Sequence, residues 1–259
     1  MTRHQMLERA MPWLVVIGAL VAWEAGCILF AVPKFILPSP TQIAASMWQF
    51  REQLGGHAAQ TLYTTVVGFA VAVAGGMLLG IVIGASRLSY KGLYPILIGF
   101  NSVPKVAVVP VLVIWFGIGS VPAIITAFLL AFFPIVVNVA TGLATIEPEV
   151  EDVLRSLGAS KRDILVKIGI PGSLPYFFAS LKIAITLALV GSVVSESIGS
   201  NYGIGYLMLS ASSQFNVPLA FAGLVVVAIM GVLIYVAFAL IEDRFTYWAT
   251  RKFDYAAGS

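Results

Sequence analysis

The chain has 259 residues, of which 59% are hydrophobic and 10% are charged, and its formal net charge is +3. Soluble globular domains carry about 25% charged residues, so this composition excludes an ordinary soluble protein. The single cysteine, Cys27, excludes an intrachain disulfide and a multi-cysteine metal site, and so small a net charge gives no indication of nucleic-acid binding.

The apolar residues gather into six stretches that are each long enough to cross a bilayer as a helix. They lie at Met11–Val32, Leu62–Ala85, Leu93–Phe116, Val121–Ile146, Tyr176–Gly199 and Val217–Ile241. The first follows two arginines, as in a signal peptide, but it exceeds the roughly 7 to 15 residues of a signal-peptide core. We therefore predict an all-α polytopic membrane protein with about six transmembrane helices, a retained N-terminal anchor and one transmembrane domain over residues 1–259.

A short amphipathic helix is predicted between the first two stretches, over Gln42–Leu54. Ser39 can cap it and Pro40 suits its first position, while its apolar residues recur at helical spacing. It is too short to span a bilayer, so we expect it to lie on the outer membrane surface. An ordered loop without a role in solute capture and a contact site for a partner are both consistent with this segment.

Gly76, Gly80 and Gly84 stand four residues apart in the second stretch. Because glycine has no side chain, this stripe predicts close packing against another helix. Nothing in the stripe itself indicates a function.

Lys105, in the third stretch, lies about 18 Å from the cytoplasmic end of that stretch at about 1.5 Å per residue. A charge at this depth marks either a functional site or an ion pair, and we favour a pair with Glu196 of the fifth stretch over direct contact with a solute. Glu24 of the first stretch is assigned no role. The uncharged polar residues in the membrane have two equally good explanations: they form hydrogen bonds between helices, or they line a path through the membrane. The candidates for such a path are Lys105, Asn138, Ser192, Ser195 and Glu196.

A charged segment, residues 147–171, interrupts the apolar pattern between the fourth and fifth stretches. Acidic residues open it, Arg155 follows, and Gly158 is placed to end a helix. We predict two short helices joined at this glycine bend, the second opening at Ser160 and closing at Pro171. After the fifth stretch, the turn-forming residues Asn201, Tyr202 and Gly203 are candidates for an outer gate by their position.

The basic residues predict the orientation of the chain. Most lysines and arginines fall in segments on one side of the predicted membrane, and only Lys34 and Arg51 fall on the other. Cytoplasmic loops carry the excess of positive charge. Both termini and the 147–171 segment are therefore expected in the cytoplasm.

The 147–171 segment resembles the cytoplasmic loop of permease subunits of ATP-binding-cassette (ABC) importers. In that loop an acidic residue and two small or apolar residues precede a glycine, and Ile-x-Leu-Pro follows. Asp replaces Glu here, Val-Leu replaces Ala-Ala and Ile replaces Leu, so the acid, the apolar face and the glycine bend are kept. The corresponding residues are Asp152, Val153, Leu154, Gly158, Ile168, Ile170 and Pro171.

Further segments are similar to the branch of these permeases that imports nitrate, taurine, alkanesulfonates, bicarbonate, pyrimidine precursors and riboflavin. Together with the loop they are specific for the family but not for the solute. They are Leu37-Pro-Ser-Pro, Thr61-Leu-Tyr-Thr-Thr-Val-Val-Gly-Phe, Val103-Pro-Lys-Val-Ala-Val-Val-Pro, Trp115-Phe-Gly-Ile-Gly and Glu196-Ser-Ile-Gly-Ser-Asn-Tyr-Gly-Ile-Gly-Tyr-Leu.

The resemblance implies a type I ABC importer permease fold and a translocation path for a small polar or anionic organic solute. It implies a complex in the lipid of a bacterial inner membrane, made of two copies of this chain, two cytoplasmic ATPase subunits that bind ATP and Mg²⁺, and an extracytoplasmic substrate-binding protein. This chain itself would bind no cofactor. The residues expected to couple to the ATPase are Glu151, Asp152, Leu154, Arg155, Leu157, Gly158, Ala159, Lys161, Ile168 and Pro171.

Other functional classes are less well supported. The chain has no Gly-x-x-x-x-Gly-Lys-Ser/Thr phosphate loop and no cluster of catalytic residue types, so it is not expected to be an enzyme. The alternative is a secondary carrier or channel that uses Lys105, Glu24 and Glu196 for ion coupling, but the two-helix segment and the lack of internal repeats argue against it. His4 and His57 lack neighbouring ligands in the sequence, so no metal site is predicted.

Overall fold

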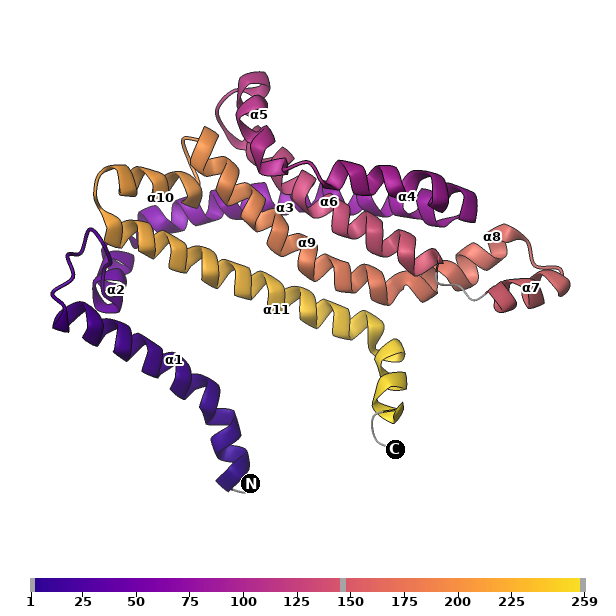
Figure 1. Cartoon of the computed structure of the whole chain (residues 1–259), viewed down its shortest axis with the longest axis horizontal. Helices are drawn as coiled ribbons and strands as arrows, with labels where there is room; N and C mark the ends of the chain where they lie inside the picture. Colours follow the sequence, from indigo (N-terminus) through magenta and orange to yellow (C-terminus); the bar gives the residue numbers. More distant parts are fainter. Residues whose placement is uncertain (1–2, 145–147, 257–259) are drawn as a thin grey trace.

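The regular structure of the chain is helical throughout the residues that the computed structural model describes, 3–144 and 148–256. Figure 1 shows α3, α6, α9 and α11 running along the length of the molecule, with α7 and α8 projecting from one end and α2 and α10 at the other. We call these the hairpin end and the α10 end. The elements are α1 (Arg3–Leu29), α2 (Pro40–Gln49), α3 (Arg51–Gly84), α4 (Arg87–Asn101), a 3₁₀ turn (Lys105–Val108), α5 (Val109–Phe116), α6 (Ser120–Ala144), α7 (Pro148–Ser156), α8 (Lys161–Ile164), a π turn (Leu165–Gly169), α9 (Ile170–Gly199), α10 (Ile204–Ser213) and α11 (Val217–Ala256).

Among the described residues, five helices are long and apolar enough to cross a membrane, and α4 with α5 makes a sixth span if that bent pair is counted as one. The prediction of about six transmembrane helices is therefore confirmed. The end of the predicted fourth span, residues 145–146, lies outside the described residues. The five unbroken spans are Met11–Leu29, Arg51–Gly84, Ser120–Ala144, Arg162–Gly199 and Val217–Phe245.

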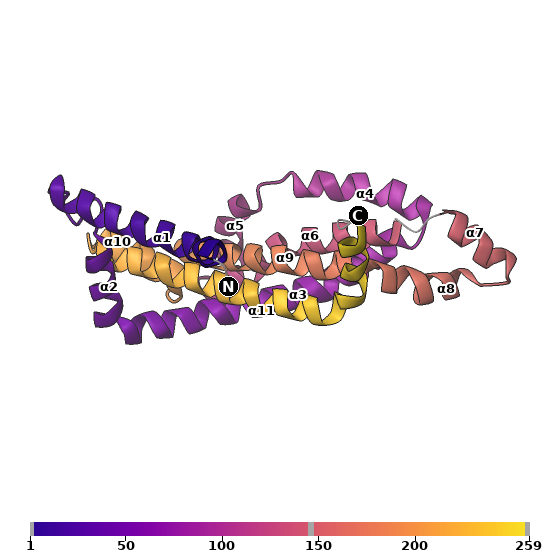
Figure 2. The same cartoon turned by 90° about the horizontal axis from the view of Figure 1, so that it is seen from below.

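The sequence analysis expected the third span to be one helix, but in the structure it is broken into two. The axes of its two halves, Leu88–Asn101 and Lys105–Phe116, differ in direction by 68°. Proline lacks an N–H and disfavours helical geometry in the residue before it, so Pro104 ends α4 and opens a 3₁₀ turn. Figure 2 shows α5 set off from the line of α4.

The predicted surface helix is shorter than expected, and the second span is longer. The backbone leaves helical geometry at Phe50, so α2 ends at Gln49 and α3 begins at Arg51. Ile43 and Leu54, which the periodicity placed on one helix, lie on these two helices and are buried in the same apolar cluster. The prediction failed because two apolar residues can be buried in the same cluster from two helices as easily as from one face of a single helix.

The second short helix of the charged segment was predicted to end at Pro171. In the structure it continues past Pro171 as α9. A proline inside a helix lacks one N–H and crowds the carbonyl four residues before it. Here the π turn Leu165–Gly169 widens the helix just ahead of Pro171, and the N–H of Ile170 bonds to the carbonyl of Leu165. The segment therefore continues without a break into the transmembrane helix that follows.

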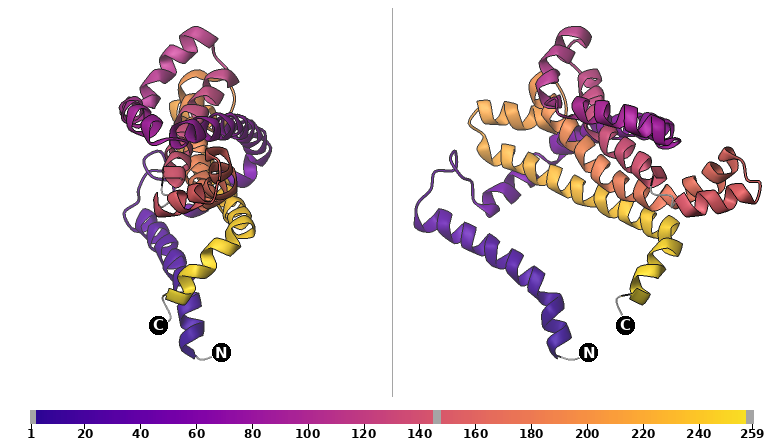
Figure 3. Two further views of the ribbon diagram at one scale, coloured as in Figure 1. Left: turned by 90° about the vertical axis from the view of Figure 1, so that its right-hand side faces the viewer. Right: turned by 45° about the vertical axis from the view of Figure 1, so that its right-hand side comes forward.

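The core forms where α6 packs between α3 and α9. The glycine stripe of α3 makes the α3–α6 contact, as predicted: a Cβ on Gly80 would lie 2.7 Å from Cβ of Val139, and one on Gly84 would lie 2.7 Å from Cβ of Leu143. In contrast, α1 packs mainly against α2, and it leans away from the bundle on the same side as the last turns of α11 (Figure 3).

Replacing Gly80 with alanine is expected to destabilise the bundle, because the added methyl group meets Val139 with no room to relax. The matched control is Gly75→Ala, whose added Cβ would make ordinary contact, 3.5 Å from the ring of Phe132. We expect the Gly80 variant to lose about 1–3 kcal/mol of stability and the Gly75 variant to stay near the parent. Thermal unfolding in detergent measures both, and equal melting temperatures would contradict the close helix contact.

Candidate functional site

The bend between α7 and α8 is closed by a glycine cap of the kind that the sequence predicts. Gly158 has a φ of 87°, and its N–H bonds to the carbonyl of Arg155 at 3.0 Å. The N–H of Ala159 reaches back to the carbonyl of Leu154, also at 3.0 Å. Together these two bonds form a Schellman motif, which ends a helix in a fixed geometry.

The second helix of the bend begins with an equally local device. The N–H of Asp163 bonds to the hydroxyl of Ser160 at 3.1 Å, which caps the first turn of α8. The carboxylate of Asp163 also forms an ion pair with Lys167 one turn later, at 2.9 Å. The two helices and their bend therefore form a defined unit, which we call the coupling hairpin (residues 148–171).

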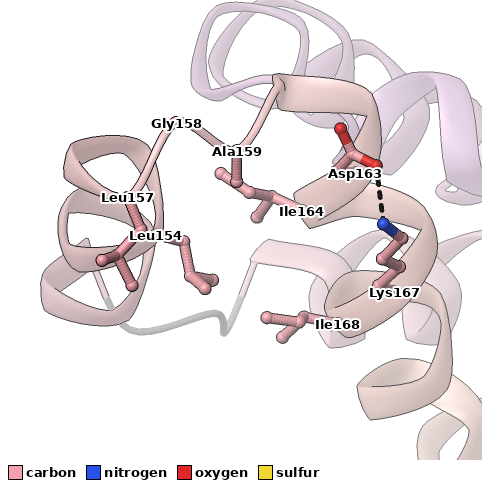
Figure 4. A pocket seen from close by; sticks show the side chains of 8 residues that line it. All are labelled: Leu154, Leu157, Gly158, Ala159, Asp163, Ile164, Lys167 and Ile168. Atoms are coloured by element: carbon pink, nitrogen blue, oxygen red, sulfur yellow. Dashed lines mark ion pairs between the residues drawn. The ribbon is translucent and has the colours of Figure 1, made fainter.

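Apolar side chains of the coupling hairpin, together with the Asp163–Lys167 ion pair, line a pocket of about 340 Å³ between its two arms. Leu154 and Leu157 come from α7 and its end, and Ile164 and Ile168 come from the opposite arm, with Gly158 and Ala159 at the bend (Figure 4). The side chain of Leu157 is 78% exposed and that of Val153 58% exposed. Large apolar groups exposed at the tip of a polar projection are typical of a contact surface for another protein.

The structure brings most of the predicted coupling residues together in this hairpin. Asp152 and Arg155 lie exposed on α7, and Ile168 and Pro171 lie half-buried where the second arm joins α9. The side chains of Glu151 and Lys161 and residue 147 at the start of the predicted loop lie outside what the structure describes.

A buried polar cluster lies at the α10 end, around the first residues of α10. The first four N–H groups of a helix have no partner within it. Here the N–H of Gly203 bonds to Nδ1 of His57 at 3.0 Å, that of Ile204 to the hydroxyl of Thr61 at 2.8 Å, and that of Gly205 to Glu196 at 3.3 Å. We call this group the α10 cap. It fixes the neutral tautomer of His57 that carries its proton on Nε2.

The carboxylate of Glu196 is held on both oxygens. Thr61 donates to one oxygen at 2.7 Å and Thr64 donates to the other at 3.1 Å, and the Glu196 side chain is almost fully buried. A negative charge is favourable at the N-terminus of a helix because the backbone dipoles point their positive end there. The α10 cap therefore joins α3, α9 and α10 through one buried acid.

The predicted ion pair between Lys105 and Glu196 is wrong. Lys105 instead donates to the carbonyl of Asn101 at 3.1 Å and to its side-chain oxygen at 2.6 Å, and its ammonium lies 5.8 Å from the centre of the Phe133 ring. The carbonyls at the C-terminus of a helix are its negative end. Each of these two charges is thus satisfied at the end of a helix: Lys105 at the end of α4, and Glu196 at the start of α10.

Glu24 follows the same rule. Its carboxylate accepts the N–H of Thr41 at 3.0 Å and the Thr41 hydroxyl at 2.8 Å, in the first turn of α2. The sequence analysis gave Glu24 no role, but the structure shows that it ties α1 to the start of the short helix α2.

The other path candidates lie inside the helix bundle of the single chain. Ser192 and Ser195 are buried on α9, and neither hydroxyl has a hydrogen-bond partner within the described chain. Asn138 is half-buried on α6 and donates to the carbonyl of Pro134 at 2.8 Å. Their role in a path stays a prediction.

The predicted outer-gate residues form the turn between α9 and α10. Asn201 and Tyr202 are exposed, and the ring of Tyr202 stacks on His57 with their centres 4.3 Å apart. Gly203 is buried, and a Cβ there would overlap the carboxylate of Glu196. Sequence reasoning missed His57, Thr61 and Thr64 as partners of this turn. The only signal was their polar character at one end of an apolar helix.

Comparison with known proteins identifies relatives along nearly the whole chain. The family model described as the inner membrane component of binding-protein-dependent transport systems matches residues 76–253. The chain is 31% identical over 250 residues to the formylaminopyrimidine transport permease protein ThiX of Halalkalibacterium halodurans, covering 96% of this chain and 98% of that protein. It is 32% identical over 231 residues to the riboflavin transport system permease protein RibX of Chloroflexus aurantiacus, covering 88% and 86%. It is 29% identical over 244 residues to the nitrate import permease protein NrtB of Synechococcus elongatus, covering 86% and 87%.

A solved structure of the MetNI methionine ABC transporter, in an inward-facing conformation, has a similar fold. The TM-score is 0.66 at 21% identity, over 77% of this chain and 97% of that chain. At this identity the likeness concerns the fold alone. The type I importer fold predicted from the sequence is thereby confirmed.

Proposed function

This chain belongs to the family of inner membrane components of binding-protein-dependent transport systems, and on that premise we propose that it forms the translocation path of an importer driven by ATP hydrolysis on separate subunits. The chain itself is an ABC transporter permease and a multi-pass membrane protein. The proposed complex contains two copies of this chain and two cytoplasmic ATPase subunits, which bind ATP and Mg²⁺, and a binding protein on the opposite side of the bacterial inner membrane.

The coupling hairpin is the observation that carries this proposal. The exposed Val153 and Leu157 offer an apolar contact surface, the bend is fixed by hydrogen bonds, and the second arm runs without a break into α9. A rigid projection that continues as a transmembrane helix can transmit movement of a docked ATPase into the membrane. Asp152, Arg155 and the residues around Gly158 are proposed to make the contact.

The proposed solute is small, and polar or anionic. The named relatives carry formylaminopyrimidine, riboflavin and nitrate, which differ in size and charge but share polarity. Among the path candidates we favour Lys105, because it lies at the break between α4 and α5, where neighbouring side chains such as Val103 and Val106 are exposed. The turn Asn201–Gly203 is the proposed outer gate.

The alternative of an ion-coupled secondary carrier finds less support. It requires Lys105, Glu24 and Glu196 to exchange ions during transport. In the folded chain each of these groups bonds to the end of a helix, so none of the three charges requires ion exchange to account for it.

The proposal is tested by sided labelling of single cysteines in a Cys27→Ala background. A cysteine replacing Leu157 in the hairpin is expected to react with an impermeant thiol reagent in inside-out vesicles and not in intact cells, and the ATPase subunits should protect it. A cysteine replacing Trp48 on α2, whose side chain is 73% exposed, is the control. It should react from the opposite side and should not be protected. Labelling of position 157 in intact cells would overturn the orientation, and lack of protection would overturn the docking surface.

A further inference from the structure

We infer that the half of α11 nearest the coupling hairpin is fastened to α9, so that a push on the hairpin moves the two helices as one body. This inference rests on the proposed function and assigns positioning roles to four residues: Lys182 and Phe178 on α9, and Glu242 and Phe245 on α11. None of them belongs to the coupling hairpin or to the path candidates.

Three contacts in a consistent antiparallel register join the two helices. A Cβ on Gly231 of α11 would touch the side chain of Leu189 at 3.5 Å. About three turns along α11, Glu242 forms an ion pair with Lys182. In the next turn, the ring of Phe245 stacks on Phe178 with their centres 5.4 Å apart and their planes 6° from parallel. As the residue number rises on α11 it falls on α9, so the contacts follow one continuous helix pair.

The ion pair is the least replaceable of these contacts. The side chains of Lys182 and Glu242 are 24% and 18% exposed, so most of each lies out of water even before lipid covers the chain. Separating two such charges would leave each without its partner in a place that water reaches poorly. Sliding of α11 along α9 would also unstack the two rings. The pair and the rings together oppose relative motion at this end.

The opposite end of α11 is packed elsewhere. Its first turns, with Leu219 and Ala222, share an apolar cluster with Ile204 and Leu207 of α10 and with Ile43 of α2. One helix thus joins the hairpin-proximal part of α9 to the helices at the α10 end. A displacement of the coupling hairpin would reach α10 by two routes: along α9 through the α10 cap, and along α11 through this cluster.

A charge-reversal series tests the ion pair. In the purified complex, Lys182→Glu is expected to lower solute uptake per ATP hydrolysed about tenfold, because it places an acid against Glu242. Glu242→Lys should do the same, and the double variant Lys182→Glu/Glu242→Lys should recover most of the uptake per ATP. The melting temperature should follow the same order. A double variant no better than the single variants in uptake per ATP would overturn the inference.

Cross-linking tests the rigid connection directly. Cysteines replacing Phe178 and Phe245 are joined in the Cys27→Ala background with a short bifunctional thiol reagent. If α9 and α11 move as one body, the cross-link blocks no motion that transport requires. The cross-linked complex should then keep uptake within about twofold of the uncross-linked sample. Loss of uptake on cross-linking would show that the helices slide past one another, and would overturn the inference. Absence of ATP-driven uptake in the unsubstituted complex would instead refute the proposed function, and the melting temperatures of the charge-reversal series would still test the fastening.

Discussion

Replacing Gly158 with valine is expected to abolish ATP-coupled uptake while leaving the transmembrane bundle folded. The φ of 87° at this position is unfavourable for a residue with a side chain, by about 1–2 kcal/mol, and a β-branched side chain is among the least tolerant. A Cβ on Gly158 would meet no neighbouring atom, so the effect acts through the backbone and not through crowding. To relieve the strain the chain must break the Schellman motif, and α7 would then lose its fixed angle to α8.

Two variants separate this effect from a general one. Gly158→Asn should keep most of the uptake, since asparagine tolerates the left-handed region better than other residues with a side chain. Gly172→Ala, in the first turns of α9, should be harmless, because its added Cβ is also unobstructed and its backbone is helical. Uptake of the ligand that co-purifies with the binding protein, measured beside ATP hydrolysis, gives the result. Full activity of Gly158→Val would contradict the role of a rigid hairpin.

Replacing Glu196 with alanine is expected to have the largest effect on stability. The substitution leaves the N–H of Gly205 without its acceptor and takes one acceptor each from Thr61 and Thr64, whose hydroxyls keep backbone carbonyls as alternatives, all within a buried site. The unsatisfied N–H costs about 1–3 kcal/mol and the removed side chain leaves a cavity that adds to this cost, so a loss of about 3 kcal/mol or more is expected, with a low yield of folded protein. Glu196→Gln keeps one acceptor oxygen and should lose less. Thermal unfolding of the purified chain in detergent measures the series.

Lys105→Met is the control that separates the α10 cap from a lysine–glutamate pair. Because Lys105 and Glu196 have different partners, the stability losses of Lys105→Met and Glu196→Gln should add in the double variant. If the double variant were more stable than Glu196→Gln alone, that result would support a Lys105–Glu196 ion pair and contradict the structure.

The sequence predicts the coupling hairpin well because the signals for it are local. Gly158 ends one helix and Ser160 caps the next, and the hydrogen bonds at each of these positions involve only residues at most four positions away in the sequence. The glycine stripe of α3 is predictable for a similar reason, since spacing alone shows which residues share a helix face. What the stripe does not specify is its partner: α6 is identified only by the fold.

The partners of the intramembrane charges are not predictable in this way. Charge complementarity suggests Lys105 and Glu196, whereas the folded chain satisfies each at a helix end. The position of that end depends on where helices break, and neither the kink at Pro104 nor the start of α10 follows from hydropathy. The bond between Gly203 and His57 joins residues 146 positions apart in the chain, so no local pattern could have revealed it. The partner of Glu24 is unpredictable for the same reason. Thr41 lies in the first turn of α2, a helix whose C-terminal end the sequence analysis also placed incorrectly.

The most direct test of the account is solute uptake by proteoliposomes that contain this chain with and without its ATPase subunits. The solute is the one that co-purifies with the binding protein, and the liposomes are supplied either with ATP at the hairpin face or with a proton or sodium gradient and no ATP. The account predicts uptake only when the ATPase subunits and hydrolysable ATP are both present, and its loss in Gly158→Val. Gradient-driven uptake by this chain alone, unchanged by Gly158→Val, would contradict the account and favour a secondary carrier.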